Sequence, residues 1–298
     1  MQLPTNHSPS RDIGGKENEG WEEKTSGKTE SSWFVDVDSS SLRFQKLEKD
    51  ISADVIIVGG GIAGMTTAYL LSKMRKKVAI VDDGNIGSGE TGRTTAQITH
   101  ALDDRYYDIE KMHGRKGARL AAESHTAAID MVESIVRKEN IDCDFERLDG
   151  YLFLDPTDKK ISLDYELAAS HKAGITATEI VDRAPLKSFD TGPCLRFPNQ
   201  AQFQPLKYLT GLALAIMRNG GMVFTETHVQ DVINTGIRTA DGRKITAKKI
   251  VVATNGLIID KISKIYDKQV PVRTYVITAR FKKGAIPKAL YWDTGNME

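Results

Sequence analysis

Three glycines, Gly59, Gly61 and Gly64, have the G-x-G-x-x-G spacing that binds the pyrophosphate of a dinucleotide. Gly59 permits a tight turn, Gly61 has no Cβ and lets a pyrophosphate come close to the backbone, and Gly64 lets the next helix pack against the preceding strand. Ile62 and Ala63 lie in the first turn of that helix, where backbone N–H groups and the helix dipole favour phosphate. The spacing therefore predicts a dinucleotide site.

The elements around these glycines have the order that the fingerprint requires. Residues 55–58 are continuously apolar and predict a buried strand, residues 62–74 predict a helix, and residues 78–81 predict a second strand. Asp82 ends the second strand, where the acid of this motif binds the ribose hydroxyls, and Asp83 is the adjacent candidate. A glycine-rich structural turn is the alternative interpretation.

A polar, glycine-rich loop follows at residues 84–96, where a nicotinamide domain usually enters a helix. Its N–H and hydroxyl groups, with Ser88, Thr94 and Thr95 among them, can bind phosphate oxygens, and Arg93 can neutralise their charge. Such a loop can lie along an extended cofactor. A solvated surface turn is the alternative interpretation.

The segments "ADVIIVGGGIAGMTTAYLL", "VAIVDDGNIGSGETGRTTAQIT" and "KIVVATNG" resemble FAD-dependent oxidoreductases of the D-amino-acid oxidase and glycine oxidase type. The resemblance covers roughly residues 50–298 and is closest to a subgroup that often carries a C-terminal Rieske domain. The Rieske ligands, Cys-x-His and Cys-x-x-His, do not occur in this sequence. The resemblance implies FAD as the cofactor.

The same resemblance assigns further residues to the cofactor. It places Asp82 at the ribose, where the family more often has Glu, and brings the Val229 backbone to the adenine. The turn after the apolar strand 250–253, with Ala253, Thr254 and Gly256, touches FAD again, although a structural turn is a fair competitor there.

The implied reaction is flavin-dependent oxidation of a C–N bond in a small amine or amino acid. A non-catalytic dinucleotide-binding remnant is one alternative, and an NAD(P)-dependent dehydrogenase is another. No acid–base pair can be nominated, because the flavin itself takes the hydride. Tyr151, Phe153, Phe203 and Gln204 are candidates for lining the substrate side, and Gln204 stands where relatives often have His.

The composition of the chain limits the kinds of molecule that it is expected to bind. The chain of 298 residues has a net charge of +1, so nothing favours nucleic acid. No apolar run approaches the length of about 20 residues that spans a bilayer, and no secretory signal is visible. The two cysteines are most simply reduced residues of a cytoplasmic protein, one or both buried, and the six histidines match no metal spacing. The oligomeric state is not predicted.

The expected fold class is α/β: a Rossmann-like FAD-binding domain with an inserted α+β substrate domain built on an antiparallel sheet. The predicted divisions are a disordered tail at 1–32, the FAD-binding domain at 33–145 and 205–266, and the substrate domain at 146–204 and 267–298. Alternation predicts a strand at 270–281. Since relatives continue beyond the position of Glu298, the last sheet is expected to be incomplete.

Further elements are predicted from periodicity and turn residues. The predicted helices are 103–113, 115–140, 161–172 and 205–219, and the predicted strands are 149–154, 222–226, 229–234, 237–245 with a hairpin turn at Asp241-Gly242, and 250–253.

Overall fold

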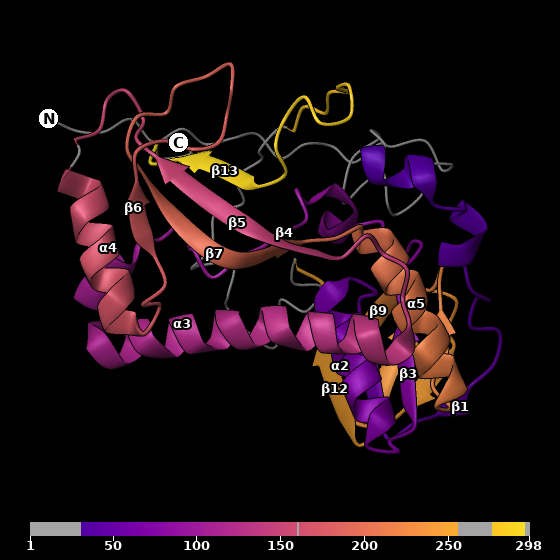
Figure 1. The fold of residues 1–298 in the computed structure, drawn as a ribbon. Coiled ribbons are helices and arrows are strands. Elements are labelled where there is room, and N and C mark those ends of the chain that lie inside the picture. The colour runs from indigo at the N-terminus through magenta and orange to yellow at the C-terminus, as the bar shows by residue number, and fades with distance from the viewer. Residues whose placement is uncertain (1–30, 160, 256–275, 296–298) are drawn as a thin grey trace, which may run out of the picture.

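The computed structural model describes residues 31–159, 161–255 and 276–295 (Figure 1). Most of the predicted tail at 1–32, Gly256 and the predicted strand up to residue 275 lie outside the described residues. Within them, the strands form a parallel sheet, a small mostly antiparallel sheet beside it, and a separate mixed sheet. The α/β class predicted from the sequence is confirmed.

The parallel sheet has the strand order β12-β2-β3-β8. Its strands are β2 (Val55–Val58), β3 (Val78–Val81), β8 (Met222–Phe224) and β12 (Lys249–Val252). Every adjacent pair is parallel. β2 and β3 are buried throughout, which agrees with their continuously apolar sequence.

Different layers cover the two faces of the parallel sheet. Ile57 and Ile80 pack into a core shared with α2 (Ile62–Lys73) and α5 (Pro205–Arg218). Ile56 packs on the opposite face, against residues of the small sheet. The small sheet contains β1 (Ile51–Ser52), β9 (Val229–Ile233), β10 (Gly236–Thr239) and β11 (Lys244–Thr246). The hairpin predicted at Asp241-Gly242 joins β10 to β11, which confirms that turn.

The third sheet extends away from the parallel sheet, above the long helix α3 (Figure 1). It contains β4 (Gln97–Ile98), β5 (Glu146–Phe153), β6 (Glu179–Val181), β7 (Cys194–Gln202) and β13 (Leu290–Asp293). β7 pairs antiparallel with β4, β5 and β6, whereas β13 is parallel to β5. β5, β6, β7 and β13 lie in the ranges predicted for the substrate domain, whereas β4 lies in the range predicted for the FAD-binding domain. The division into these two domains stays a prediction.

Two helices pack beside this sheet. α3 spans Tyr106–Glu139, but the backbone of Gly114 (φ 69°) is not helical and divides α3 into two helices, as predicted from 103–113 and 115–140. α4 spans Ile161–Ala173 and ends at Gly174, whose φ of +104° favours glycine. Both cysteines are buried and free, as predicted. None of the described helices is long and apolar enough to cross a membrane.

The strand predicted at 270–281 is wrong over its described part. Residues 276–281 form no strand, and Ile277 is 93% exposed. The alternating pattern fits a half-buried strand, but these residues pair with no neighbouring strand of the described chain. β13 supplies the strand beside β5 instead, where Trp292 packs against Phe197.

The N-terminal described residues form two short 3-10 helices, η1 (Ser32–Asp36) and η2 (Ser39–Leu42). Leu42 is buried in the same core as α2 and α5. The sequence predicts that Trp33, Phe34 and Val35 pack an N-terminal arm onto the fold. Trp33 and Phe34 contact this core, whereas Val35 is 67% exposed.

Candidate functional site

The glycine turn lies at the carboxyl end of β2, against the end of β12. Gly59 has φ +108°, and a Cβ built on it would lie 2.4 Å from the carbonyl oxygen of Ala253. A Cβ built on Gly64 would lie 2.0 Å from the carbonyl oxygen of Gly59. Both distances are far below a van der Waals contact, so the fold itself requires glycine at these two positions.

Gly61 has a different environment. It is the N-cap of α2 with an extended backbone, and Thr91 Oγ1, at 3.1 Å, is the one described atom within 4 Å of a built Cβ. The Thr91 hydroxyl also accepts a hydrogen bond of 3.0 Å from the Ile62 N–H. Ile62 and Ala63 are exposed. The first turn of α2 is thus accessible, and the polar group next to it is the flexible side chain of Thr91.

Asp82, at the end of β3, forms hydrogen bonds with both the glycine turn and the loop at 84–96. Its Oδ2 accepts from the Gly60 N–H, and its Oδ1 accepts from the Gly84 N–H at 2.9 Å. Sequence reasoning missed this structural role, because neither contact belongs to the spacing of the fingerprint. The contact of Asp82 with a ribose stays a prediction.

We expect Asp82→Ala to lower the free energy of unfolding of the cofactor-free protein by about 2 kcal/mol, because two backbone N–H groups lose a charged acceptor. Asp83→Ala is the matched control. Its partly exposed carboxylate lies 3.6 Å from His228 Nδ1 and should contribute less than about 1 kcal/mol. Urea unfolding checks both, and equal losses for the two variants would contradict the structural role of Asp82.

The segment before β9 lies next to Asp82. The Thr227 N–H donates to the Asp82 carbonyl oxygen at 2.8 Å, and Thr227 is followed by His228 and by Val229, which is buried in the core below the parallel sheet. Asp83 and Val229, both predicted to meet the adenosine half of the cofactor, are therefore positioned around the end of β3.

The loop at 84–96 folds back onto the glycine turn. The Gly87 N–H donates to the Gly60 carbonyl oxygen at 3.2 Å, and Gly87 packs on leucines of α5. A short helix, η3 (Glu90–Arg93), follows. The Arg93 guanidinium donates to the carbonyl oxygens of Ser88 and Gly89, so this side chain holds its own loop together. Thr94 and Thr95 are exposed beyond it.

The end of β12 completes the site. The Ala253 N–H donates to the Val58 carbonyl oxygen at 2.8 Å, and Thr254 follows, partly buried. The structure therefore brings the predicted residues of the glycine turn, of the loop and of the end of β12 to one edge of the parallel sheet, where open α/β sheets bind ligands. Gly256 lies outside the described residues.

Two of the candidates for the substrate side are placed elsewhere. Phe203 is buried in the core, edge-on to Tyr208 at 5.4 Å between ring centroids. Gln204 caps α5 by accepting the Lys207 N–H at 2.9 Å. Packing in the core explains a phenylalanine at position 203, and capping of α5 explains a glutamine at position 204, without a contact to substrate. Tyr151 instead lies on the third sheet, stacked on Tyr291 at 5.8 Å, and Phe153 is partly buried on the same strand.

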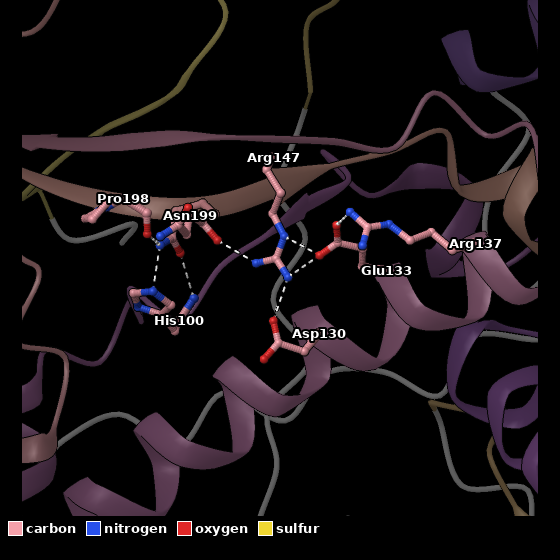
Figure 2. Close-up of polar contacts among 8 residues, drawn as sticks. His100, Asp130, Glu133, Arg137, Arg147, Pro198 and Asn199 are labelled. Carbon is pink, nitrogen blue, oxygen red and sulfur yellow. Dashed lines mark hydrogen bonds and ion pairs between the residues drawn. The ribbon is translucent and has the colours of Figure 1, made fainter.

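A pocket of about 500 Å³ lies between α3 and the third sheet. Figure 2 shows Arg147 projecting from β5 toward α3, where its guanidinium binds Asp130 Oδ1 at 2.6 Å, Glu133 Oε2 at 2.6 Å and the Asn199 carbonyl oxygen at 2.8 Å. The charges of this pocket are therefore paired with one another.

His100 lines the same pocket and is buried. Gln200 Nε2 lies 2.7 Å from His100 Nε2, and Gln200 Oε1 accepts the His100 backbone N–H. Burial lowers the pKa of His100, so the imidazole is neutral at physiological pH. The His100–Gln200 pair holds the segment before α3 against β7, whereas the Arg147 ion pairs join α3 to β5. Neither feature was predicted from the sequence.

Comparisons with known proteins agree with this geometry. A family model described as DAO, FAD dependent oxidoreductase, matches residues 54–296. The putative Rieske 2Fe-2S iron-sulfur protein YhfW of Bacillus subtilis is 36% identical over 68% of this chain and 39% of its own length. Gamma-glutamylputrescine oxidoreductase of Escherichia coli is 28% identical over 83% of this chain and 60% of its own length.

The fold is also that of solved structures. Glycine oxidase from Geobacillus kaustophilus superposes with a TM-score of 0.58 at 20% identity, covering 68% of this chain and 55% of that chain. The chain thus spans between 39% and 60% of the length of these relatives. The family match extends over most of the sequence and begins at the strand that leads into the glycine turn. The chain belongs to the family of FAD-dependent oxidoreductases of the D-amino-acid oxidase type.

Proposed function

We propose that the site at the ends of β2, β3 and β12 binds FAD, and that the protein uses it to oxidise a C–N bond of a small amine or amino acid. The observation that carries the proposal is the accessible N-terminus of α2. Gly61 leaves the backbone uncovered, and Ile62 and Ala63 are exposed beside it. A pyrophosphate fits this arrangement of N–H groups and helix dipole.

The residues proposed to hold FAD divide by the part of the cofactor that they face. The pyrophosphate residues are Gly59, Gly61, Ile62, Ala63 and Gly64; the ribose residues are Asp82 and Asp83; the loop residues are Ser88, Arg93, Thr94 and Thr95; the adenine residue is Val229; and the last turn contributes Ala253, Thr254 and Gly256. The structure adds Thr91, whose hydroxyl already bonds the α2 N-terminus. A threonine among the loop glycines was the available signal for this residue.

When bound, FAD supplies a hydride acceptor, which is what oxidation of a C–N bond requires. The contribution of the protein is then to bind and orient the substrate and to exclude water. The stacked pair of Tyr151 and Tyr291 provides a flat aromatic surface on the third sheet for this purpose. The relatives named for glycine and gamma-glutamylputrescine both act on small amino compounds, which supports a substrate of this class.

The test is anaerobic mixing of FAD-loaded protein with a panel of small amino acids and of primary and secondary amines. We expect one chemical class to bleach the visible absorbance of the flavin. Protein that retains FAD but is reduced by no member of the panel would contradict the oxidase function and leave only binding. Tyr151→Ala, compared with Phe189→Ala, should then slow bleaching selectively, because Phe189 contacts Phe153 and not the stacked pair.

A further inference from the structure

The N-terminal strap, defined as Ser31–Asp36, lies on the loop of the proposed FAD site. The Trp33 indole Nε1 donates to the Thr94 carbonyl oxygen at 2.7 Å, and the Ser31 hydroxyl donates to the Gly92 carbonyl oxygen. The Phe34 ring lies 3.5 Å from the position of a Cβ built on Gly92. The strap therefore contacts the loop on both sides of Arg93.

The other side of the strap is anchored to α5. Gln204 Nε2 donates to the Trp33 carbonyl oxygen at 2.8 Å, while Gln204 Oε1 accepts the Lys207 N–H at 2.9 Å. The Gln204 N–H donates to the Cys143 carbonyl oxygen at 2.7 Å, and Gln204 is 5% exposed. A buried side chain, bonded at both Oε1 and Nε2, thus fixes the main chain of Trp33 relative to the core.

Trp33 consequently connects a rigid element to a functional loop: its carbonyl is held by Gln204 at the start of α5, and its indole holds Thr94. The loop includes Thr91, whose hydroxyl meets the Ile62 N–H, and the exposed Thr94 and Thr95. A loop already held in its bound conformation loses less entropy when a ligand binds. The strap precedes residue 54, where the family match begins.

We propose that the N-terminal strap preorganises the loop at 88–95 for the phosphates of FAD, with Trp33 and Gln204 as positioning residues. The proposal rests on FAD binding at this site. If FAD binds more tightly when the strap holds the loop, then by linkage FAD binding also stabilises the strap in contact with the loop. The strap thus couples cofactor occupancy to the position of the chain before the FAD-binding fold.

Two variants of the full chain test this step. Trp33→Phe keeps an aromatic ring and removes the indole donor, and Gln204→Glu keeps the cap of α5 and removes the donor to Trp33. Trp33→Phe should raise the Kd for FAD about three- to tenfold, as expected for the loss of one hydrogen bond. Gln204→Glu should raise it at least as much, because a carboxylate oxygen then faces the Trp33 carbonyl oxygen. Trp292→Phe, in β13 of the third sheet, is the matched control and should leave the Kd unchanged.

A second readout separates positioning from general stability. Chymotrypsin cleaves after Trp33 and Phe34, so FAD should slow cleavage of the strap in the wild-type protein, and less so in Trp33→Phe. Wild-type affinity in both variants, or strap cleavage that FAD does not change, would overturn the proposal while leaving FAD binding intact. A wild-type chain that binds no FAD would instead overturn the proposed function itself.

Discussion

Gly61→Val is expected to abolish FAD binding and leave the chain folded. A built Cβ at this position meets the flexible Thr91 side chain alone among the described atoms, so the fold tolerates it. A branched side chain would nevertheless occupy the space that a pyrophosphate needs. Losing two charge-assisted hydrogen bonds of about 1.5–3 kcal/mol each raises the Kd at least about 100-fold. Titration with FAD and circular dichroism measure the two effects.

Gly64→Ala is the matched comparison, three residues along the same helix. Its Cβ would collide with the Gly59 carbonyl oxygen, a backbone atom that cannot move aside cheaply. We expect this variant to lose about 1–3 kcal/mol of stability, the usual range for overpacking, as well as FAD binding. If Gly61→Val unfolded the protein or Gly64→Ala did not destabilise it, the distinction between binding glycine and packing glycine would be wrong.

Glu166→Gln is expected to stabilise the protein by about 3 kcal/mol at pH 8 and hardly at all at pH 4. Glu166 is 2% exposed on α4, and its Oε2 accepts from the Tyr107 N–H at 3.4 Å at the start of α3. Burial raises the pKa of this carboxyl from its ordinary 4.5 to about 7, although Arg105 and the backbone N–H groups of Tyr106 and Tyr107 partly oppose the shift.

The sign of the pH dependence follows from the two pKa values. Between pH 4.5 and about 7, the folded protein keeps a proton on Glu166 that the unfolded chain has lost. The contribution of Glu166 to the free energy of unfolding therefore falls as the pH rises through this window and is constant above it. Glutamine carries no charge, so the variant lacks this fall.

Urea unfolding at a series of pH values checks the Glu166 prediction. Glu123→Gln, which removes an exposed carboxylate paired with Arg119 on α3, is the control and should change the midpoint little at pH 8. Parallel curves for Glu166→Gln and wild type across the pH range would contradict the burial of an acid at this helix start.

The parallel sheet and its glycine turn could be predicted from the sequence because their signals are local. Residues 55–58 and 78–81 are continuously apolar, and the glycines that follow residue 58 have the G-x-G-x-x-G spacing. β7 could not be predicted in the same way. Asn199, with φ +62°, lies where the pairing with β5 shifts register, and this interrupts the alternation that marks a strand.

Within the candidate site, the unpredicted features are contacts between residues far apart in the sequence. Thr91 bonds Ile62, Trp33 bonds Thr94, and Gln204 bonds Trp33. A periodic pattern reports burial and secondary structure but does not identify the partner of a polar side chain. Gln204 shows the consequence: its position suggested substrate contact, whereas it caps α5 and anchors the strap.

The proposed function requires that this chain binds FAD at the N-terminus of α2. The most direct measurement is the flavin-to-protein ratio of the purified chain after reconstitution with FAD and gel filtration, with Gly61→Val treated in parallel. We predict a ratio close to one for the wild type and close to zero for the folded variant. Equal flavin content in both proteins, or none in the wild type, would contradict the claim.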